Sequence, residues 1–291
     1  MMSLINTNYD YLATMGISEA SPQVGVIVSV YYLGCAVGAV LFSWLADEYG
    51  RKLGLLTCLS TACLGNLIMF ASGLGYSRGA LVVMYTGRVV MGLGVGGVDS
   101  VIPTYSSELS SDHARGKAMA QEFQSNIFGL NMAFAINLAV TRGLGKYNQW
   151  AWRIPIIAMQ VYTVGLLAFI RYLPESPRWY VFHDRTEDAK NSLYKIEGEE
   201  EGKKKADEMI EAASKERDET IGYMDMIIPG RPYFHPTVIT VMGQVNQALT
   251  GYGGKFTHST SSLKTYHSHI HSRLSLRPPN LPTPRLRHRE V

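Results

Sequence analysis

The chain has 291 residues, of which 46% are hydrophobic and 18% are charged, and its formal net charge is +3. Soluble domains carry about 25% charged residues, so the composition argues against an ordinary soluble protein. The small net charge gives no electrostatic support for nucleic-acid binding. The apolar residues are concentrated in the first two thirds of the chain.

Five apolar stretches follow an amino-terminal segment, residues 1–23, that contains neither Lys nor Arg. A helix needs about 20 mostly apolar residues to cross the hydrocarbon core of a membrane. The stretches that meet this requirement are residues 24–46, 53–71, 81–104, 118–140 and 154–173. Because backbone polar groups in lipid must be paired within the segment, the sequence predicts an all-α membrane protein whose transmembrane helices occupy residues 24–173.

Basic residues indicate the orientation of these helices. They gather in the loops after the first and third stretches and in the segment after the fifth, which together hold Arg51, Lys52, Arg115, Lys117, Arg171, Arg178, Arg185 and Lys190. The opposite side offers only Arg78, Arg142 and Lys146. The positive-inside rule therefore predicts that residues 1–23 lie outside and that residues 174–235 lie in the cytoplasm.

Glycines four residues apart mark faces where helices are expected to pack closely. Gly34 and Gly38 share one face of the first stretch, and Gly92 and Gly96 share one face of the third. This spacing lets helix backbones approach each other in membranes.

The predicted cytoplasmic linker, residues 174–235, contains an amphipathic pattern over residues 203–220. Ala206, Met209, Ile210 and Ala213 recur at helical spacing among charged residues, which indicates a surface helix. Residues 236–254 resemble the start of a further membrane helix.

Residues 255–291 are basic and rich in Ser, Pro and His, and we expect a disordered or out-of-frame tail. His267, His269 and His271 lie in this tail. Metal ligands need a fixed scaffold, so the sequence predicts no metal site and no cofactor.

Four motifs occur in order at the predicted helix ends. Residues 47–52 read Asp-Glu-Tyr-Gly-Arg-Lys, residues 152–155 read Trp-Arg-Ile-Pro and residues 174–179 read Pro-Glu-Ser-Pro-Arg-Trp. The longest motif covers residues 88–115, with an arginine at each end and clustered glycines between. Together these motifs resemble the sugar porter family of the major facilitator superfamily, of the fungal type, over about residues 10–254.

The resemblance implies a partial major facilitator fold. Members have twelve helices in two halves, with the substrate held between the halves. The five stretches then correspond to helices two to six, and residues 236–254 to the start of helix seven. The resemblance implies alternating-access transport of a hexose or related polyol, with proton coupling in full-length relatives, membrane lipid as surroundings and the plasma membrane as location. We expect a truncated amino-terminal half that is inactive alone.

The resemblance also implies a cytoplasmic gating network, in which acidic and basic groups stabilise the outward-open state. Acid and base recur together at each cytoplasmic loop, which favours such a network over ordinary interface charge. The expected members are Asp47, Arg51, Glu108, Arg115, Arg153, Glu175 and Arg178.

Polar groups inside the stretches are the candidates for coupling and substrate binding, because charges in the membrane are costly unless paired. In proton-coupled relatives the residue matching Arg88 pairs with an acid on the first helix, and none replaces that acid here. Gln124, Asn126 and Gln247 are the substrate-binding candidates. The family's glutamine position falls on Phe123, one residue before Gln124.

Other functions remain as alternatives. Glu122 and the altered glutamine positions leave room for another small solute, such as quinate. A third hypothesis is a protein that does not transport but acts as a sensor or as a partner of intact transporters. An enzyme is not expected, because no nucleophile–base pair or metal-ligand spacing occurs. The glycines at residues 92–97 lie inside an apolar stretch and follow no predicted strand, which excludes a dinucleotide loop.

Overall fold

The computed structural model describes residues 8–18, 22–73, 79–110, 114–145, 147–216, 228–231 and 233–249. These residues form helices and turns, with no strand among them. The chain divides into two units, residues 1–219 and 220–291, and each is described by itself.

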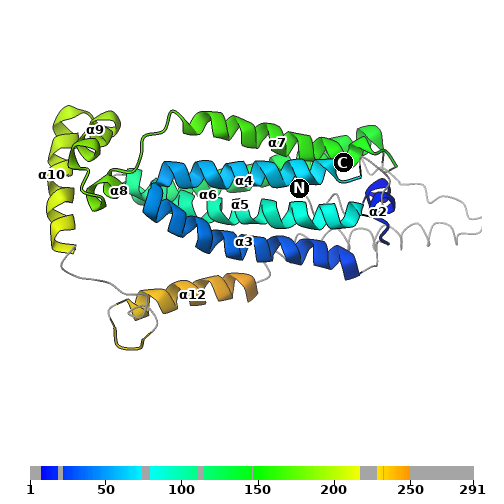
Figure 1. The fold of residues 1–291 in the computed structure, drawn as a ribbon, viewed down its shortest axis with the longest axis horizontal. Helices are drawn as coiled ribbons and strands as arrows, with labels where there is room; N and C mark the ends of the chain where they lie inside the picture. The colour runs from blue at the N-terminus through cyan, green and yellow to red at the C-terminus, as the bar shows by residue number, and fades with distance from the viewer. Residues whose placement is uncertain are drawn as a thin grey trace, which may run out of the picture. The chain divides into compact units, whose positions relative to one another are not determined.

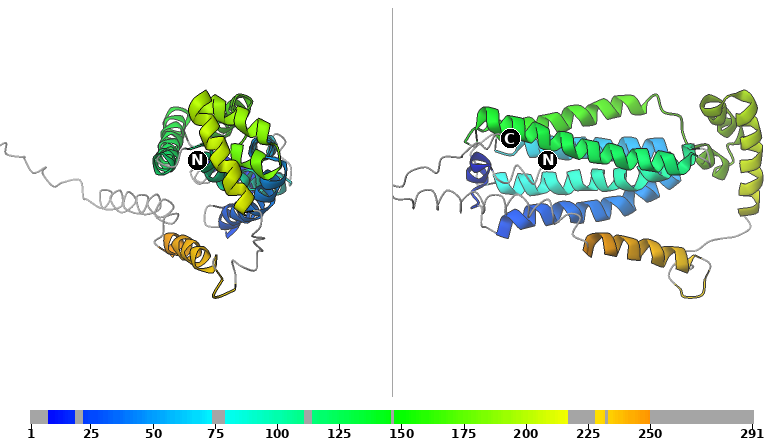
Figure 2. Two further views of the ribbon diagram at one scale, coloured as in Figure 1. Left: turned by 90° about the vertical axis from the view of Figure 1, so that its left-hand side faces the viewer. Right: turned by 180° about the vertical axis from the view of Figure 1, so that it is seen from behind.

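Five long helices form the body of the first unit, and they run side by side (Figures 1 and 2). They are α3 (Pro22–Tyr49), α4 (Arg51–Ala71), α5 (Ala80–Leu109), α6 (Arg115–Leu144) and α7 (Trp150–Ile170). All five are long and apolar enough to cross a membrane, which confirms the number expected from the sequence. Several extend beyond the predicted apolar stretches, because their polar ends continue the helix past the hydrophobic centre.

Helix α5 is the centre of this bundle and packs most extensively against α3 and α4. Glycines make the close approach possible. A Cβ added to Gly96 would collide with the Cys35 carbonyl group of α3, and one added to Gly38 would collide with the backbone of Leu93 in α5. The close glycine packing predicted for α3 and α5 is therefore confirmed.

A short helix, α2 (Tyr9–Met15), lies at one end of the bundle. The Asn8 side chain caps it by accepting hydrogen bonds from the Asp10 and Tyr11 N–H groups, and Gly16 ends it with a φ of 68°. Tyr11 packs edge to face against Trp152, and both are almost fully buried. The sequence predicted only an external segment here, whereas the structure shows a helix packed onto the bundle.

Three helices cover the opposite end: α8 (Pro177–Phe182), α9 (Thr186–Glu197) and α10 (Glu199–Glu216). Ser176 caps α8 by accepting from the Trp179 N–H group, and Pro177 fits the first turn, where no backbone donor is needed. Val181 and Ala189 form a small core against which Met209 and Ile210 pack. The amphipathic helix predicted over residues 203–220 is thus present as α10, which begins four residues earlier.

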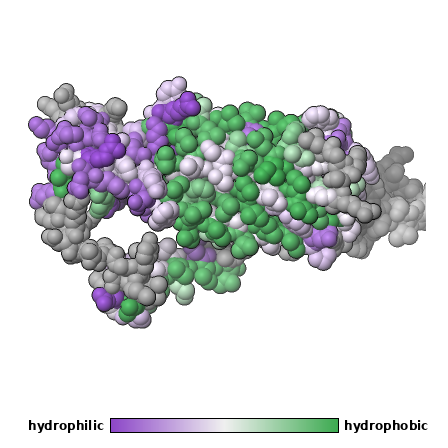
Figure 3. All heavy atoms as spheres, viewed as in Figure 1, coloured by the Kyte–Doolittle hydropathy of each residue, from purple (hydrophilic) through white to green (hydrophobic). Residues whose placement is uncertain are grey.

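Apolar side chains cover the outer surface of the long helices, while polar residues gather over α8 to α10 (Figure 3). Leu33 and Val40 of α3, Phe128 of α6 and Phe169 of α7 are all largely exposed. A contiguous apolar surface of this kind would be unstable in water, and it fits helices that are surrounded by lipid.

The second unit contains α12 (Phe234–Leu249), an apolar helix in the described part of that unit. The tail of residues 255–291 and its three histidines, His267, His269 and His271, lie outside the described residues.

Candidate functional site

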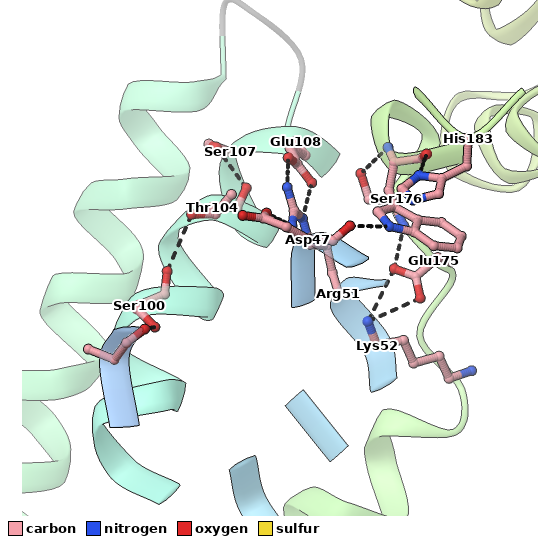
Figure 4. Close-up of polar contacts among 12 residues, drawn as sticks. Asp47, Arg51, Lys52, Ser100, Thr104, Ser107, Glu108, Glu175, Ser176 and His183 are labelled. Atoms are coloured by element: carbon pink, nitrogen blue, oxygen red, sulfur yellow. Dashed lines mark hydrogen bonds and ion pairs between the residues drawn. The ribbon is translucent and has the colours of Figure 1, made fainter. Parts of the chain in front are cut away.

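The clearest concentration of paired charge lies at the end of the bundle that carries α8 to α10. Arg51 begins α4 and donates two hydrogen bonds to the Glu108 carboxylate near the end of α5, from Nε to Oε2 at 3.1 Å and from Nη2 to Oε1 at 2.9 Å. Arg51 also pairs with Asp47 of α3. We call Asp47, Arg51 and Glu108 the charge cluster (Figure 4). It joins the ends of three helices through one guanidinium group.

Gly50 allows this cluster to form. It is the single residue between α3 and α4 and has a φ of 105°, a conformation that other residues rarely adopt. A Cβ at this position would also lie 2.7 Å from the Glu175 Oε2 atom. Glycine therefore provides both the sharp turn and the room for Glu175 to approach.

Glu175 connects the charge cluster to the segment that follows α7. Its carboxylate accepts hydrogen bonds from the backbone N–H groups of Lys52 and Ser176, at 3.0–3.1 Å. The first turn of a helix leaves its N–H groups without helical partners, so an acidic side chain at the start of α4 satisfies a donor and complements the helix dipole.

Three contacts of this region were not predicted from the sequence. The Trp179 Nε1 atom donates to the Asp47 carbonyl oxygen at 2.9 Å, and the Tyr105 hydroxyl group donates to the Pro174 carbonyl oxygen at 2.5 Å. Lys52 Nζ donates to the Arg171 carbonyl oxygen at 3.0 Å. All three donors lie in the motifs described above, but their acceptors are backbone oxygens, which leave no signal in the sequence.

Two other arginines, Arg115 and Arg178, were also predicted for this end. Arg115 is the first residue of α6. Arg178 lies in α8, with its guanidinium carbon 5.6 Å from the centre of the Phe182 ring. Their role in a gating network stays a prediction.

The assignment of Arg153 to the cytoplasmic network is wrong. Its guanidinium donates to the carbonyl oxygens of Phe70, at 3.2 Å, and Gly73, at 3.0 Å. Phe70 lies in the last turn of α4 and Gly73 follows just after it, whereas Arg51 begins that helix. Arg153 is 3% exposed and stacks on Trp152, at 4.7 Å from the ring centre. It therefore caps the far end of α4, the end that carries α2.

Arg88 is buried in the middle of the bundle, with 3% of its surface exposed. Tyr11 of α2 and Tyr31 of α3 lie close to its guanidinium. Its Nε atom has no hydrogen-bond partner among the described residues. A buried guanidinium with an unpaired N–H donor costs free energy. Arg88 is therefore a candidate for a role other than stabilising the fold.

The predicted substrate-binding residues belong to different units of the chain. Gln124 and Asn126 are both exposed on α6. Gln247 belongs to α12 in the second unit, and its side chain lies outside the part that the structure describes. Their role in substrate binding stays a prediction.

A polar contact between α4 and α7 was also missed. The Asn66 amide donates to the Ile156 carbonyl oxygen at 3.1 Å and to the Gln160 side chain at 3.0 Å. Asn66 is 2% exposed. Asparagine in an apolar stretch is a signal for such an interhelical hydrogen bond.

Comparison with solved structures supports the fold. The proton:xylose symporter XylE bound to 6-bromo-6-deoxy-D-glucose matches with a TM-score of 0.67 and 22% identity, over 77% of this chain and 50% of that chain. The partially occluded inward-open form of the xylose transporter XylE from E. coli matches with a TM-score of 0.65 and 21% identity, over 74% of this chain and 56% of that chain. These likenesses confirm the predicted major facilitator fold.

Comparison with known sequences gives the family. The low-affinity glucose transporter of Kluyveromyces lactis is 29% identical over 82% of this chain and 42% of its own length. Hexose transporter 2 of the same species is 32% identical over 60% of this chain and 29% of its own length. The chain therefore spans less than half the length of these relatives.

The family model described as "Sugar (and other) transporter" matches residues 1–267, which is most of the chain. Its members are transporters rather than enzymes, which agrees with the sequence-based expectation. Together with five helices that can span a membrane, the match identifies a multi-pass membrane protein. The chain belongs to the sugar transporter family.

Proposed function

We propose that residues 24–173 form part of the amino-terminal helix bundle of a transporter that moves a hexose or related polyol by alternating access. The observation that carries this proposal is the charge cluster, in which one arginine ties α3, α4 and α5 together. The hexose and glucose transporters among the relatives support a sugar as the substrate.

In this proposal the charge cluster lies at the cytoplasmic end, residues 1–23 lie outside and residues 174–235 form the cytoplasmic linker. Residues 236–254 begin the next membrane helix. The cluster and the Glu175 contacts hold the linker against α3, α4 and α5 in one state of the cycle. A rocking motion that opens this end must loosen those contacts, so their strength sets part of the balance between the two states.

Arg88 is our candidate for proton coupling, with Gln124, Asn126 and Gln247 as candidates for sugar contacts. Arg88 supports the proposal through its burial and its unused Nε donor. An acidic group or a water that approaches this donor would lower the free-energy cost of burying the Arg88 charge. If the partner is an acid, that cost would depend on whether the acid is protonated.

Alternating access needs two bundles that rock about a central site. The described first unit supplies one bundle. We therefore propose that the 291-residue chain expressed alone takes up no sugar, and that transport needs a second bundle.

A chimaera tests the proposal. Residues 24–254 replace the matching segment of the K. lactis low-affinity glucose transporter in a yeast strain that lacks hexose uptake. We expect saturable uptake of labelled glucose by the chimaera and none by the 291-residue chain. A chimaera that reaches the membrane and elutes as a single monodisperse species, but transports no hexose or polyol, would contradict the proposed function. Saturable uptake by the chain alone would contradict the need for a second bundle.

A further inference from the structure

A polar cleft lies beside the charge cluster, between the segment that precedes α8 and the face of α9. Its volume is about 480 Å³, within the range of roughly 300–1,000 Å³ that is typical of small-molecule sites. Its walls include Glu175, Tyr180, Asp188, Asn191, Ser192 and Tyr194. All of these residues lie in the first unit, and none is among the proposed sugar-contacting residues of the transport pathway.

The two carboxylates in the cleft already have partners, so the cleft is not simply a trap for cations. Asp188 pairs with Arg185 through its Oδ2 atom at 2.8 Å, and Arg185 itself stacks on Tyr180, 4.9 Å from the ring centre. Glu175 accepts from two backbone N–H groups. A cationic ligand would have to compete with groups that are built into the fold.

These carboxylates still have acceptor capacity, because an ionised carboxylate offers about four lone-pair sites. The Asn191 amide adds a donor and an acceptor on the exposed face of α9. Tyr180 and Tyr194 contribute aromatic surface and hydroxyl groups. Burial raises the pKa of the Tyr180 hydroxyl, so this hydroxyl stays protonated at neutral pH and can donate a hydrogen bond. Many hydroxyl-binding groups around aromatic surface suit a neutral polyhydroxylated ligand better than an ion or an apolar molecule.

The cleft and the charge cluster share one side chain. Glu175 lines the cleft and also accepts from the Lys52 N–H group at the start of α4. The Ser192 hydroxyl, from α9, donates to the Glu175 carbonyl oxygen at 2.7 Å. A ligand that bridges Glu175 and α9 would therefore strengthen the attachment of α9 to the region that docks on α4.

We propose that this cleft binds a neutral sugar or polyol in the cytoplasm, at a site separate from the transport pathway, and that binding stabilises the docking of α8 and α9 on the charge cluster. The choice of ligand rests on the proposed function, since the delivered solute would be the polyol present at this face. Sugar that has entered the cell would then favour the state in which the charge cluster is closed.

Hydrogen–deuterium exchange of the purified 291-residue chain in lipid nanodiscs tests the inference, with D-glucose as the probe and glycine betaine at equal concentration as the osmotic control. At a glucose concentration of about five times the dissociation constant, the population with an empty cleft falls about sixfold. We expect exchange in residues 177–194 and in the peptide containing Lys52 to slow saturably, by up to this factor. Betaine should leave both segments unchanged.

Two adjacent substitutions on α9 provide the matched comparison. Asn191→Ala removes a polar group that lines the cleft, and we expect it to weaken glucose binding about tenfold. Lys190→Ala changes the neighbouring residue, which pairs with Glu187 and does not line the cleft, so glucose protection should persist. Equal losses in the two variants would overturn the assignment of the site.

The outcomes for the cleft and for transport are independent. Glucose protection confined to the long helices, with none in residues 177–194, would overturn the cleft and leave the proposed transport intact. Protection of residues 177–194 without uptake by the chimaera would retain the cleft and contradict the transport proposal.

Discussion

The charge cluster contains one buried and one exposed carboxylate, and this difference predicts unequal effects of removing them. The side chains of Arg51 and Glu108 are only 12% and 8% exposed, whereas that of Asp47 is 66% exposed. Breaking a buried ion pair by removing one partner costs about 3–5 kcal/mol, whereas an exposed pair contributes about 0.2–1 kcal/mol. The two substitutions to be compared are Glu108→Gln and Asp47→Asn.

The expected magnitudes follow from the hydrogen bonds. Glu108→Gln retains one acceptor oxygen, so one of the two bonds to Arg51 can persist, but the charge that balances the guanidinium is lost. We expect the free energy of unfolding to fall by about 3 kcal/mol, at the lower end of the buried-pair range. Asp47→Asn should lower it by less than about 1 kcal/mol, and salt should reduce that difference further.

Unfolding of the purified chain in mixed micelles, followed by helical circular dichroism as the fraction of denaturing detergent rises, measures both values. The slope of the transition should stay constant, so that the midpoint reports stability. Equal losses for the two variants, or a larger loss for Asp47→Asn, would refute the assignment of Glu108 as the main partner of Arg51.

Three further predictions follow from the packing and the buried arginines. Gly96→Ala should destabilise the bundle by about 1–3 kcal/mol, because the new Cβ would meet the Cys35 carbonyl group. A Cβ at Gly129 would have nothing within 4 Å, so Gly129→Ala should be neutral or stabilising by up to about 1 kcal/mol. The same detergent titration compares the two variants. Arg153→Met should speed hydrogen exchange at the end of α4 and in α2 by at least tenfold, since it removes two charge-assisted bonds of about 1.5–3 kcal/mol each, and unchanged exchange would rule out its capping role. Arg88→Met should leave stability within about 1 kcal/mol, since an apolar chain of similar length replaces an incompletely paired buried charge, and should abolish the pH dependence of uptake by the chimaera; unaltered pH dependence would exclude Arg88 from coupling.

The membrane helices were predictable because lipid imposes a simple rule. A long apolar stretch in lipid has to be helical, so the number of spans followed from hydropathy alone. Their ends were less predictable, because α3 and α5 continue through polar residues such as Glu48 and Ser107. The folding of residues 9–15 was also missed, since so short a segment depends on packing against Trp152 rather than on its own pattern.

The candidate site was predicted as a set of residue types rather than as a geometry. Asp47, Arg51 and Glu108 meet as expected. Arg153 was misplaced because it was grouped with the other charged motif residues. It lies at the start of α7, at the end of the bundle opposite the charge cluster. The contacts made by Trp179, Tyr105 and Lys52 go to backbone oxygens, whose positions depend on the fold and not on residue identity.

Substituted-cysteine labelling tests the central claim, that five membrane spans separate the charge cluster from the α2 end. Tyr147, beside α2 in a stack with Tyr9, is 80% exposed, and the side chain of Glu187 in α9 is 83% exposed. The parent chain, whose three cysteines all lie in α3 and α4, gives the background.

We predict that a membrane-impermeant maleimide labels Tyr147→Cys in intact cells and labels Glu187→Cys only after permeabilisation. Labelling of both positions in intact cells, or recovery of the folded chain from the aqueous fraction without detergent, would contradict this account.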